Sequence, residues 1–406
     1  MVQLSMPTSS GPVTLDLPDD WRLTFLPIAA APPLTQVEMR QALQRPIGTR
    51  GIRELARGKS KVVILVDDTS RPTPAHAFVP LIIEELEAAG IRDSGIKIVG
   101  GTGCHRPMEG PDFRLKLGDE IVDRYECVSH NPFEHTVCIG TTSRGMRVEL
   151  NMEVAEAELK IAAGGIIPHH GAGFGGGAKL MLPGVCSIDT IAAMHSLNPS
   201  GGFCKIVDNG LRAEMEEAAR MAGLDVIVNC VLNARSEVAG LYAGDLVAAH
   251  RAGVQKAFEL YSVAAPADAD AAIVGGFPKD REFYQSFGGL ICSRTVRPGG
   301  TIFILAAGSD GAGLHYLEER ERLAAQRRPP APLREPEGAG NQHLLVWCPG
   351  VGPKEAARSL PPSASFHRDL GAAVAELRAR HHRASVNVFP QGSLTILRSA
   401  YATPAC

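Results

Sequence analysis

The stretch KVVILVDDTSRPTPAHAFVPLIIEELEAAGIRDSGIKIVGG, residues 61–101, decides the fold class of this chain. It begins with the apolar run 61–66 and ends with the apolar run 96–101, and such continuous runs are typical of strands buried on both faces. Between them, residues 75–90 have the pattern of a helix that stops at Gly90. A strand, a helix and a strand in this order form a βαβ unit, which predicts a parallel sheet.

The same alternation continues beyond this unit. Further strands are predicted at 159–165 and 224–233, with helices at 187–197, 211–223 and 245–262. The small, polar segment AAPADADAA, 264–272, then separates a second series, in which we predict strands at 271–277, 301–307, 343–348 and 384–390 and helices at 314–328 and 369–382. We therefore predict two α/β domains, residues 1–265 and 266–406, the first with a largely parallel sheet.

The composition of the 406 residues narrows the class of protein. A hydrophobic fraction of 45% and a charged fraction of 21% are typical of a globular chain, and a net charge of -3 does not favour nucleic-acid binding. No apolar run reaches the roughly 18–20 residues of a membrane helix, and the first residues lack the pattern of a signal peptide. The nine cysteines contain no C-x-x-C pair, which indicates reduced thiols. We expect a cytoplasmic protein without membrane partners.

Polar segments follow three of the predicted strands. They are DDTSRPTP (67–74), TGCHRPM (102–108) and IIPHHGAGFGGGAK (166–179). Open parallel sheets bind their ligands outside the carboxyl ends of the strands. The fold therefore predicts one site, at that edge of the sheet and between the domains, toward which these segments bring Asp68, Arg71, His105, Arg106, His169, His170 and Lys179.

The third segment belongs to PHHGAGFGGGAKLMLPG, 168–184, which holds six glycines. Glycine lowers chain stability through its entropy and permits close approach of a ligand to the backbone, so we interpret this loop as a ligand cradle with no packing role. It matches G-x-G-x-x-G, but the nearest acidic residue, Asp189, begins a helix instead of ending a second strand. A P-loop would need glycine and a hydroxyl where Ala178 and Leu180 stand.

Each candidate residue also has a structural interpretation. Asp67 and Asp68 are common turn formers and helix caps. A single histidine beside a glycine turn, such as His105, is often held only for its hydrogen bonds. His195 shares an apolar helix face with Ile188 and Ile191, which favours a core histidine.

Taken in order, DDTSRPTP, GTGCHRPM, PHHGAGFGGGAKLMLPG and a histidine 16 residues after the lysine resemble the nickel-dependent lactate racemase family. The resemblance returns at GGFPKDREFYQSFGG, 275–289. It implies a nickel-pincer nucleotide, nickel(II)-pyridinium-3,5-bisthiocarboxylic acid mononucleotide, built by separate maturation enzymes. It also implies that a lysine holds this cofactor covalently and that one histidine completes the nickel coordination.

By this resemblance, Lys179 corresponds to the attachment lysine and His195 to the nickel ligand. His105 and His169 correspond to two acid–base histidines, a role that suits a side chain titrating near neutral pH. Imidazole is also a suitable nickel ligand. The remaining correspondences are cofactor contacts at Asp68, Thr69, Ser70 and Arg71 and substrate contacts at Arg71, Tyr284 and Gln285.

The implied reaction is racemisation or epimerisation of a 2-hydroxy acid. One histidine takes the hydroxyl proton while Cα gives hydride to the cofactor, and hydride then returns to the other face. Lactate-specific members carry a lysine three residues after the glutamine, where this chain has Gly288. Because the glycine removes a cation and opens space, we expect a 2-hydroxy acid other than lactate.

Two other functions stay open from the sequence. An NAD-dependent dehydrogenase would use the G-x-G-x-x-G match, and a non-catalytic nickel- or nucleotide-binding protein would need Lys179 and His195 but not both His105 and His169. The presence of all four favours the enzyme. The oligomeric state, the stereochemical preference and the role of His170 do not follow from the sequence.

Overall fold

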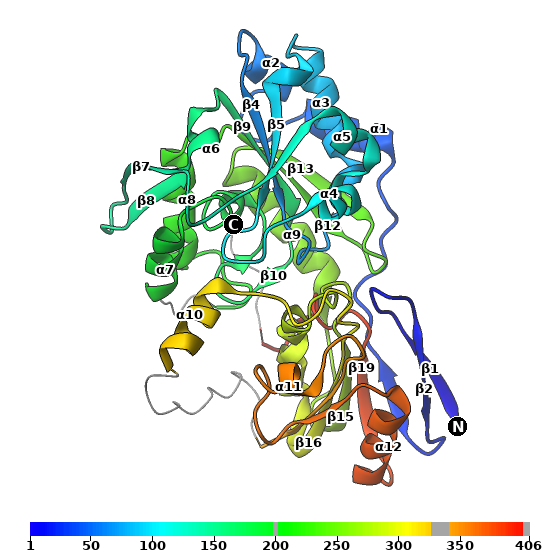
Figure 1. Cartoon of the computed structure of the whole chain (residues 1–406). Helices are drawn as coiled ribbons and strands as arrows, with labels where there is room; N and C mark the ends of the chain where they lie inside the picture. The colour runs from blue at the N-terminus through cyan, green and yellow to red at the C-terminus, as the bar shows by residue number, and fades with distance from the viewer. Residues whose placement is uncertain (198–201, 326–340, 401–406) are drawn as a thin grey trace. The chain divides into compact units, whose positions relative to one another are not determined.

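The computed structural model of the chain describes residues 1–197, 202–325 and 341–400. Its contacts divide it into two compact units. The larger unit comprises Ala31–Glu259 and Leu314–Glu321, and the smaller unit comprises Met1–Ala30, Leu260–Gly313 and the described residues from Arg322 on. Both are α/β structures, as predicted, and their elements are labelled in Figure 1.

A six-stranded sheet forms the centre of the larger unit, in the order β13-β12-β9-β4-β5-β6. Neighbouring strands are parallel except for the antiparallel pair β12 and β13, which confirms a largely parallel sheet. Its strands are β4 (Val62–Asp67), β5 (Ile96–Gly101), β6 (Glu126–Ser129), β9 (Leu159–Gly165), β12 (Val226–Leu232) and β13 (Val238–Gly244). Two hairpins accompany it, β7 (Thr136–Thr141) with β8 (Arg147–Asn151) and β10 (Pro168–His169) with β11 (Gly173–Phe174).

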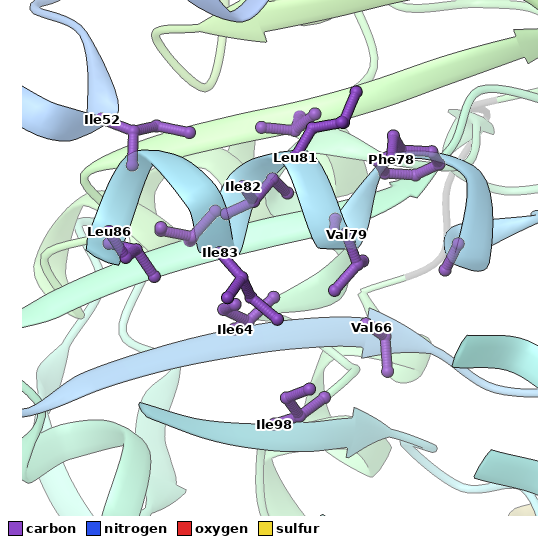
Figure 2. Close-up of a cluster of buried hydrophobic side chains, with 14 of the residues drawn as sticks. Ile52, Ile64, Val66, Phe78, Val79, Leu81, Ile82, Ile83, Leu86 and Ile98 are labelled. Carbon is purple, nitrogen blue, oxygen red and sulfur yellow. The ribbon is translucent and has the colours of Figure 1, made fainter. Parts of the chain in front are cut away.

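Alternate residues of β4 face two separate cores, which is why its apolar run is continuous. Ile64 and Val66 pack in one core. Their neighbours include Phe78, Ile82 of α3 (Val79–Glu87) and other apolar side chains, as Figure 2 shows. Val63 and Leu65 pack in the other core. The first core is covered by α1 (Gln36–Gln44), α2 (Ile52–Ala56), α3 (Val79–Glu87), α4 (Gly110–Leu117) and α5 (Asp119–Arg124).

The second core is covered by the elements that surround the glycine-rich loop. These are α6 (Met152–Glu156), η3 (Gly177–Leu180), α7 (Ile188–Ser196), α8 (Gly210–Met221) and α9 (Ala248–Tyr261). Two short turns, η1 (Ala75–Ala77) and η2 (Asp93–Gly95), flank α3. The predicted strands 96–101 and 159–165 agree with β5 and β9, whereas the predicted helix 75–90 is divided into η1 and α3.

The smaller unit has its own six-stranded sheet, β18-β17-β16-β15-β19-β3, with all neighbours parallel. Its strands are β3 (Arg22–Phe25), β15 (Ala269–Gly275), β16 (Val296–Leu305), β17 (His343–Trp347), β18 (Ser365–His367) and β19 (Ser385–Phe389). The other elements are β1 (Val2–Met6), β2 (Val13–Leu17), β14 (Ser262–Val263), β20 (Ile396–Leu397), η4 (Tyr284–Thr295), α11 (Pro353–Ala356) and α12 (Leu370–Arg380). The helix α10 (Tyr316–Ala325) begins in the larger unit.

The units differ from the expected division at residue 265 in two places. The first 30 residues belong to the smaller unit, because β3 pairs with β19 and Trp21 is buried in that unit's core. Residues 314–321 belong to the larger unit, where Leu317 packs into the second core. Among the described residues, the helices are too short or too polar to span a bilayer.

Candidate active site

The three predicted polar segments come together at one edge of the larger unit's sheet. They follow β4, β5 and β9, which are neighbours in the sheet with parallel pairing. Their side chains line a cavity that holds about 730 Å³ of space when its open mouth is counted. The polar side chains of this lining are Asp67, Asp68, Arg71, Thr102, Cys104, His105, His169, Lys179, His195 and His315.

Asp68 orients His105. The Asp68 carboxylate accepts a 2.8 Å hydrogen bond from His105 Nδ1 and a 2.8 Å bond from the Ser70 backbone N–H. Burial alone would raise the pKa of Asp68, but the charge and hydrogen bond of His105, together with Arg71, hold this pKa well below its usual value. Because a carboxylate only accepts, the neutral His105 ring carries its proton on Nδ1, which leaves the Nε2 lone pair available. Asp68 is therefore more than a turn former.

Asp67 has the structural role that was the alternative interpretation. Its carboxylate accepts hydrogen bonds from Thr73 Oγ1 at 2.6 Å and from the Gly165 backbone N–H at 3.1 Å, and so connects the end of β4 to the end of β9. Lys116 of α4 donates to Asp67 at 2.9 Å and to the Arg71 carbonyl at 2.8 Å. This buried lysine, which sequence reasoning missed, holds the backbone of the 67–74 segment.

Arg106 supports the site without lining the cavity. Its guanidinium donates two hydrogen bonds to Asp112, at 2.7 and 2.9 Å, and a third to Thr69 Oγ1 at 3.2 Å. Ser70 lies behind His105, with its hydroxyl 3.3 Å from Nδ1. Of the two arginines that the predicted strand ends bring to this edge, Arg71 lines the cavity and Arg106 does not.

The glycine-rich loop does have a packing role, so that part of the interpretation was wrong. Gly173, Gly176 and Gly177 have φ angles of 74°, 72° and 58°. A Cβ on Gly173 would lie 1.9 Å from the Lys205 carbonyl oxygen, and one on Gly177 would lie 2.9 Å from the His250 ring. The glycines are needed because the chain packs closely against itself. Gly176 also lines the cavity, so close approach to a ligand remains part of its role.

A buried arginine holds this loop in place. Arg212 of α8 donates to the carbonyl oxygens of Ala172, Phe174 and Gly176. Burial lowers the pKa of Arg212 to about 10, so the side chain stays charged at neutral pH and its hydrogen bonds are charge-assisted. Its position on a later helix gave no local signal in the sequence.

Lys179, on η3, lines the cavity with an amine of unusual acidity. Burial, followed by the positive charge of Arg71, lowers the pKa of Lys179 to about 7. A substantial fraction of this amine is therefore unprotonated at neutral pH. An unprotonated amine is a nucleophile, whereas an ammonium group is not.

His195 is exposed toward solvent and lines the cavity, so its interpretation as a core histidine was wrong. Its Nδ1 lies 2.8 Å from the Ile191 carbonyl oxygen one turn earlier in α7. A carbonyl only accepts, so Nδ1 carries the proton and the neutral ring keeps a lone pair on Nε2. This is the arrangement that commonly fixes a metal-binding histidine.

His169 has the opposite ring polarity from His105. It ends β10, and its Nδ1 accepts a 3.2 Å hydrogen bond from the Ala172 backbone N–H. The proton of the neutral ring is therefore on Nε2. The cavity thus combines two histidines whose neutral rings carry the proton on different nitrogens. His170, next in the chain, is exposed and does not line the cavity.

His315 is a cavity residue that sequence reasoning missed. Its Nε2 lies 3.1 Å from Cys104 Sγ, and its ring centroid is 5.7 Å from that of His105 and 6.0 Å from that of His195. Burial and the charges of these histidines lower the pKa of His315 to about 3, while burial raises the pKa of Cys104 to about 11. Both side chains are therefore uncharged at neutral pH. His315 follows the predicted strand 301–307 of the second domain, so its position in this cavity was not expected.

Tyr284 and Gln285 begin η4 in the smaller unit and are not among the residues that line this cavity. In the same unit, the position of a Cβ on Gly288 lies 3.0 Å from Lys279 Nζ. The expected open space at Gly288 is therefore wrong, because an ammonium group of another lysine fills it.

Comparisons with known proteins show the family to which the chain belongs. Residues 9–201 match the model of the lactate racemase N-terminal domain. The chain is 36% identical over 326 residues to a lactate racemase of Lactiplantibacillus plantarum, covering 77% of this chain and 76% of that protein. It is 32% identical over 325 residues to a lactate racemase of Thermoanaerobacterium thermosaccharolyticum, with the same coverage.

Two solved structures share the fold. The lactate racemase apoprotein of Thermoanaerobacterium thermosaccharolyticum matches with a TM-score of 0.79 and 27% identity, over 98% of this chain and 100% of that one. A Thermotoga maritima protein matches with a TM-score of 0.66 over 91% of this chain and 100% of that one, and its 18% identity supports the fold alone. The predicted resemblance is thus confirmed, and this chain belongs to the lactate racemase family, a family of nickel-dependent racemases, which makes it an enzyme of the isomerase class.

Proposed function

We propose that this protein racemises or epimerises a 2-hydroxy acid with a nickel-pincer nucleotide held covalently by Lys179 and coordinated by His195. The observation that carries this proposal is the content of one cavity. The cavity is lined by an amine with a pKa near 7, by His195 with its Nδ1 bonded to a backbone carbonyl, and by two histidines of opposite ring polarity. A binding protein would have no use for the last two.

The residues present fit the proposed cofactor. The Lys179 amine is a nucleophile at neutral pH, which suits covalent attachment to a carboxyl-derived arm of the nucleotide. Imidazole is a suitable ligand for nickel, and the Ile191 carbonyl fixes the tautomer of the neutral His195 ring so that coordination would be through Nε2. Asp68, Thr69, Ser70 and Arg71 form the adjoining cofactor segment, whose backbone Lys116 holds. When bound, the nucleotide supplies a reversible acceptor for the hydride of the substrate Cα.

The two histidines divide the proton chemistry. The bond from Nδ1 to Asp68 fixes the tautomer of the neutral His105 ring, whose Nε2 takes the hydroxyl proton as Cα loses hydride. His169, in its doubly protonated form, donates a proton when hydride returns to the opposite face of the planar 2-keto acid, and it is left as a neutral ring. Microscopic reversibility lets the two residues exchange roles, so both enantiomers are substrates. Arg71 is the cavity cation suited to the substrate carboxylate.

Lactate is not the substrate that we propose. In place of the lysine three residues after Gln285 this chain has Gly288, and Lys279 brings its ammonium to that position from another point of the backbone. Because the Lys279 ammonium comes from a different backbone position than the lysine of lactate-specific members, we propose that it suits a different 2-hydroxy acid. We propose Tyr284 and Gln285 as further substrate contacts.

The glycine-rich loop does not have the structure that an NAD-dependent dehydrogenase would need. A dinucleotide fingerprint requires the last glycine of G-x-G-x-x-G to open a helix that receives the pyrophosphate. Here the loop forms the hairpin of β10 and β11 and continues into the four-residue turn η3. We also propose that the protein is cytoplasmic and that separate maturation enzymes build its cofactor.

Replacing either acid–base histidine should lower turnover strongly. His105→Ala and His169→Ala should each reduce kcat by ~10²–10⁴-fold in cofactor-loaded protein, because proton transfer by a positioned side chain contributes that much. Racemisation is followed by chiral chromatography, and intact mass and nickel content verify that each variant is loaded. The exposed His382 provides the matched control, His382→Ala, which should keep wild-type turnover. A loaded His105 or His169 variant within about tenfold of wild type would exclude the assigned role.

The amine of Lys179 should react at an unusually low pH. In cofactor-free protein, acylation of Lys179 should reach half of its maximal rate near pH 7 and level off above it, because the pKa of this amine is lowered to about 7. An ordinary lysine has a pKa of about 10.4, so its reactivity keeps rising through this range. The measurement is peptide mass spectrometry after brief exposure to an acylating reagent, with the peptide of the exposed Lys354 as the internal reference. Parallel pH profiles for the two lysines would refute this expectation.

Lactate should be a poor substrate of the loaded enzyme. We expect kcat/KM for either lactate enantiomer to lie at least about tenfold below that for the best of a series of other 2-hydroxy acids, since a mismatch in pocket contacts commonly has that effect. The series is assayed as both enantiomers under one set of conditions. If lactate gives the highest kcat/KM, the substrate part of the proposal is wrong and the racemase assignment stands.

A further inference from the structure

Three potential metal ligands meet at one side of the cavity. One ligand atom from each of Cys104, His105 and His315 lies within 4.8 Å of the other two. The backbone holds the two segments together, because the Tyr316 N–H donates to the Cys104 carbonyl at 2.8 Å and His105 and His315 form an antiparallel bridge. All three residues belong to the larger unit. Their proximity therefore does not depend on side-chain contacts alone.

The donor set is the one that zinc prefers. Tetrahedral zinc binds thiolate at about 2.3 Å and imidazole at about 2.0 Å, which places a sulfur and a nitrogen ligand roughly 3.5 Å apart. Cys104 Sγ and His315 Nε2 are already 3.1 Å apart. His105 donates from Nδ1 to the Asp68 carboxylate, the usual support of a zinc-binding histidine. A small adjustment would therefore admit the ion.

We propose that Cys104, His105 and His315 form a second metal site, separate from His195, that binds one zinc-like divalent ion in the cofactor-free protein. The three side chains leave the fourth coordination position for a water or a small anion in the cavity, as in zinc sites with three protein ligands. This site is not required by the proposed racemase chemistry.

Binding has a definite proton balance. The Cys104 thiol releases its proton to solvent and coordinates as thiolate. His315 coordinates through Nε2 and carries its ring proton on Nδ1, which gives up the long 3.4 Å contact from the Glu318 N–H. Lys179 and Arg71 line the same cavity and oppose a cation, whereas the new thiolate and the Asp68 carboxylate favour it.

The site also has a consequence for catalysis, which rests on the proposed function. The metal would occupy Nε2 of His105, the atom proposed to take the substrate hydroxyl proton. Zinc should therefore inhibit the loaded enzyme in competition with substrate. Metal binding by the cofactor-free protein is independent of this consequence, so the two claims can fail separately.

The test is a titration of cofactor-free full-length protein with Co²⁺, which replaces zinc and absorbs in the near ultraviolet when a thiolate coordinates it. We expect one equivalent of Co²⁺ to produce this band and one equivalent of Zn²⁺ to abolish it. Cys104→Ser should lose the band, and His315→Ala should weaken binding by more than about 100-fold, because even loss of an outer hydrogen bond to a ligand commonly weakens binding by 10–100-fold.

The exposed Cys138 supplies the matched control, Cys138→Ser, which should keep both the band and the affinity. Circular dichroism verifies that each variant is folded, and His315→Ala decides the question if Cys104→Ser is not. Absence of saturable binding to wild type, a band that persists in folded Cys104→Ser, or unchanged affinity in folded His315→Ala would overturn the second site. None of these results would bear on nickel at His195.

Discussion

β4 pairs in parallel with β9 on one side and β5 on the other, and this pairing places the ends of all three strands at one edge of the sheet. The Asp67 carboxylate fixes that edge, because it joins the end of β4 to Thr73 and to Gly165, the last residue of β9. Lys116 neutralises the carboxylate and holds the next segment. Asp68 and Arg71 directly follow the end of β4 that this connection holds, and the segment with His169 and Lys179 follows the end of β9.

The electrostatics of the cavity follow from burial among fixed charges. Arg71 and burial favour the uncharged amine of Lys179, whereas His105 and Arg71 keep Asp68 ionised despite its burial. The ionised Asp68 in turn sets the tautomer of His105. The same arrangement of charges thus favours a nucleophilic amine at Lys179 and an oriented base at His105. Shifted pKa values of this kind are common in enzyme active sites.

The parallel sheet and the cavity could be predicted because the apolar runs at 61–66, 96–101 and 159–165 are local signals, and polar segments follow each of them. The first 30 residues could not be placed, since their pairing with β19 joins opposite ends of the chain. Arg212 and His315 were missed for the same reason, as their partners lie far away in sequence. The glycines were misinterpreted because close backbone contacts, such as Gly173 with Lys205, leave no pattern in the sequence.

The central claim is that Lys179 carries a nickel-containing nucleotide. The most direct measurement is the intact mass and nickel content of protein produced together with the cofactor-maturation enzymes, for wild type, Lys179→Ala and the exposed control Lys354→Ala. We predict that wild type and Lys354→Ala carry a covalent adduct that contains nickel, and that Lys179→Ala carries no adduct. An adduct that persists on Lys179→Ala, or a wild-type protein without adduct or nickel while a known racemase is loaded in the same cells, would contradict it.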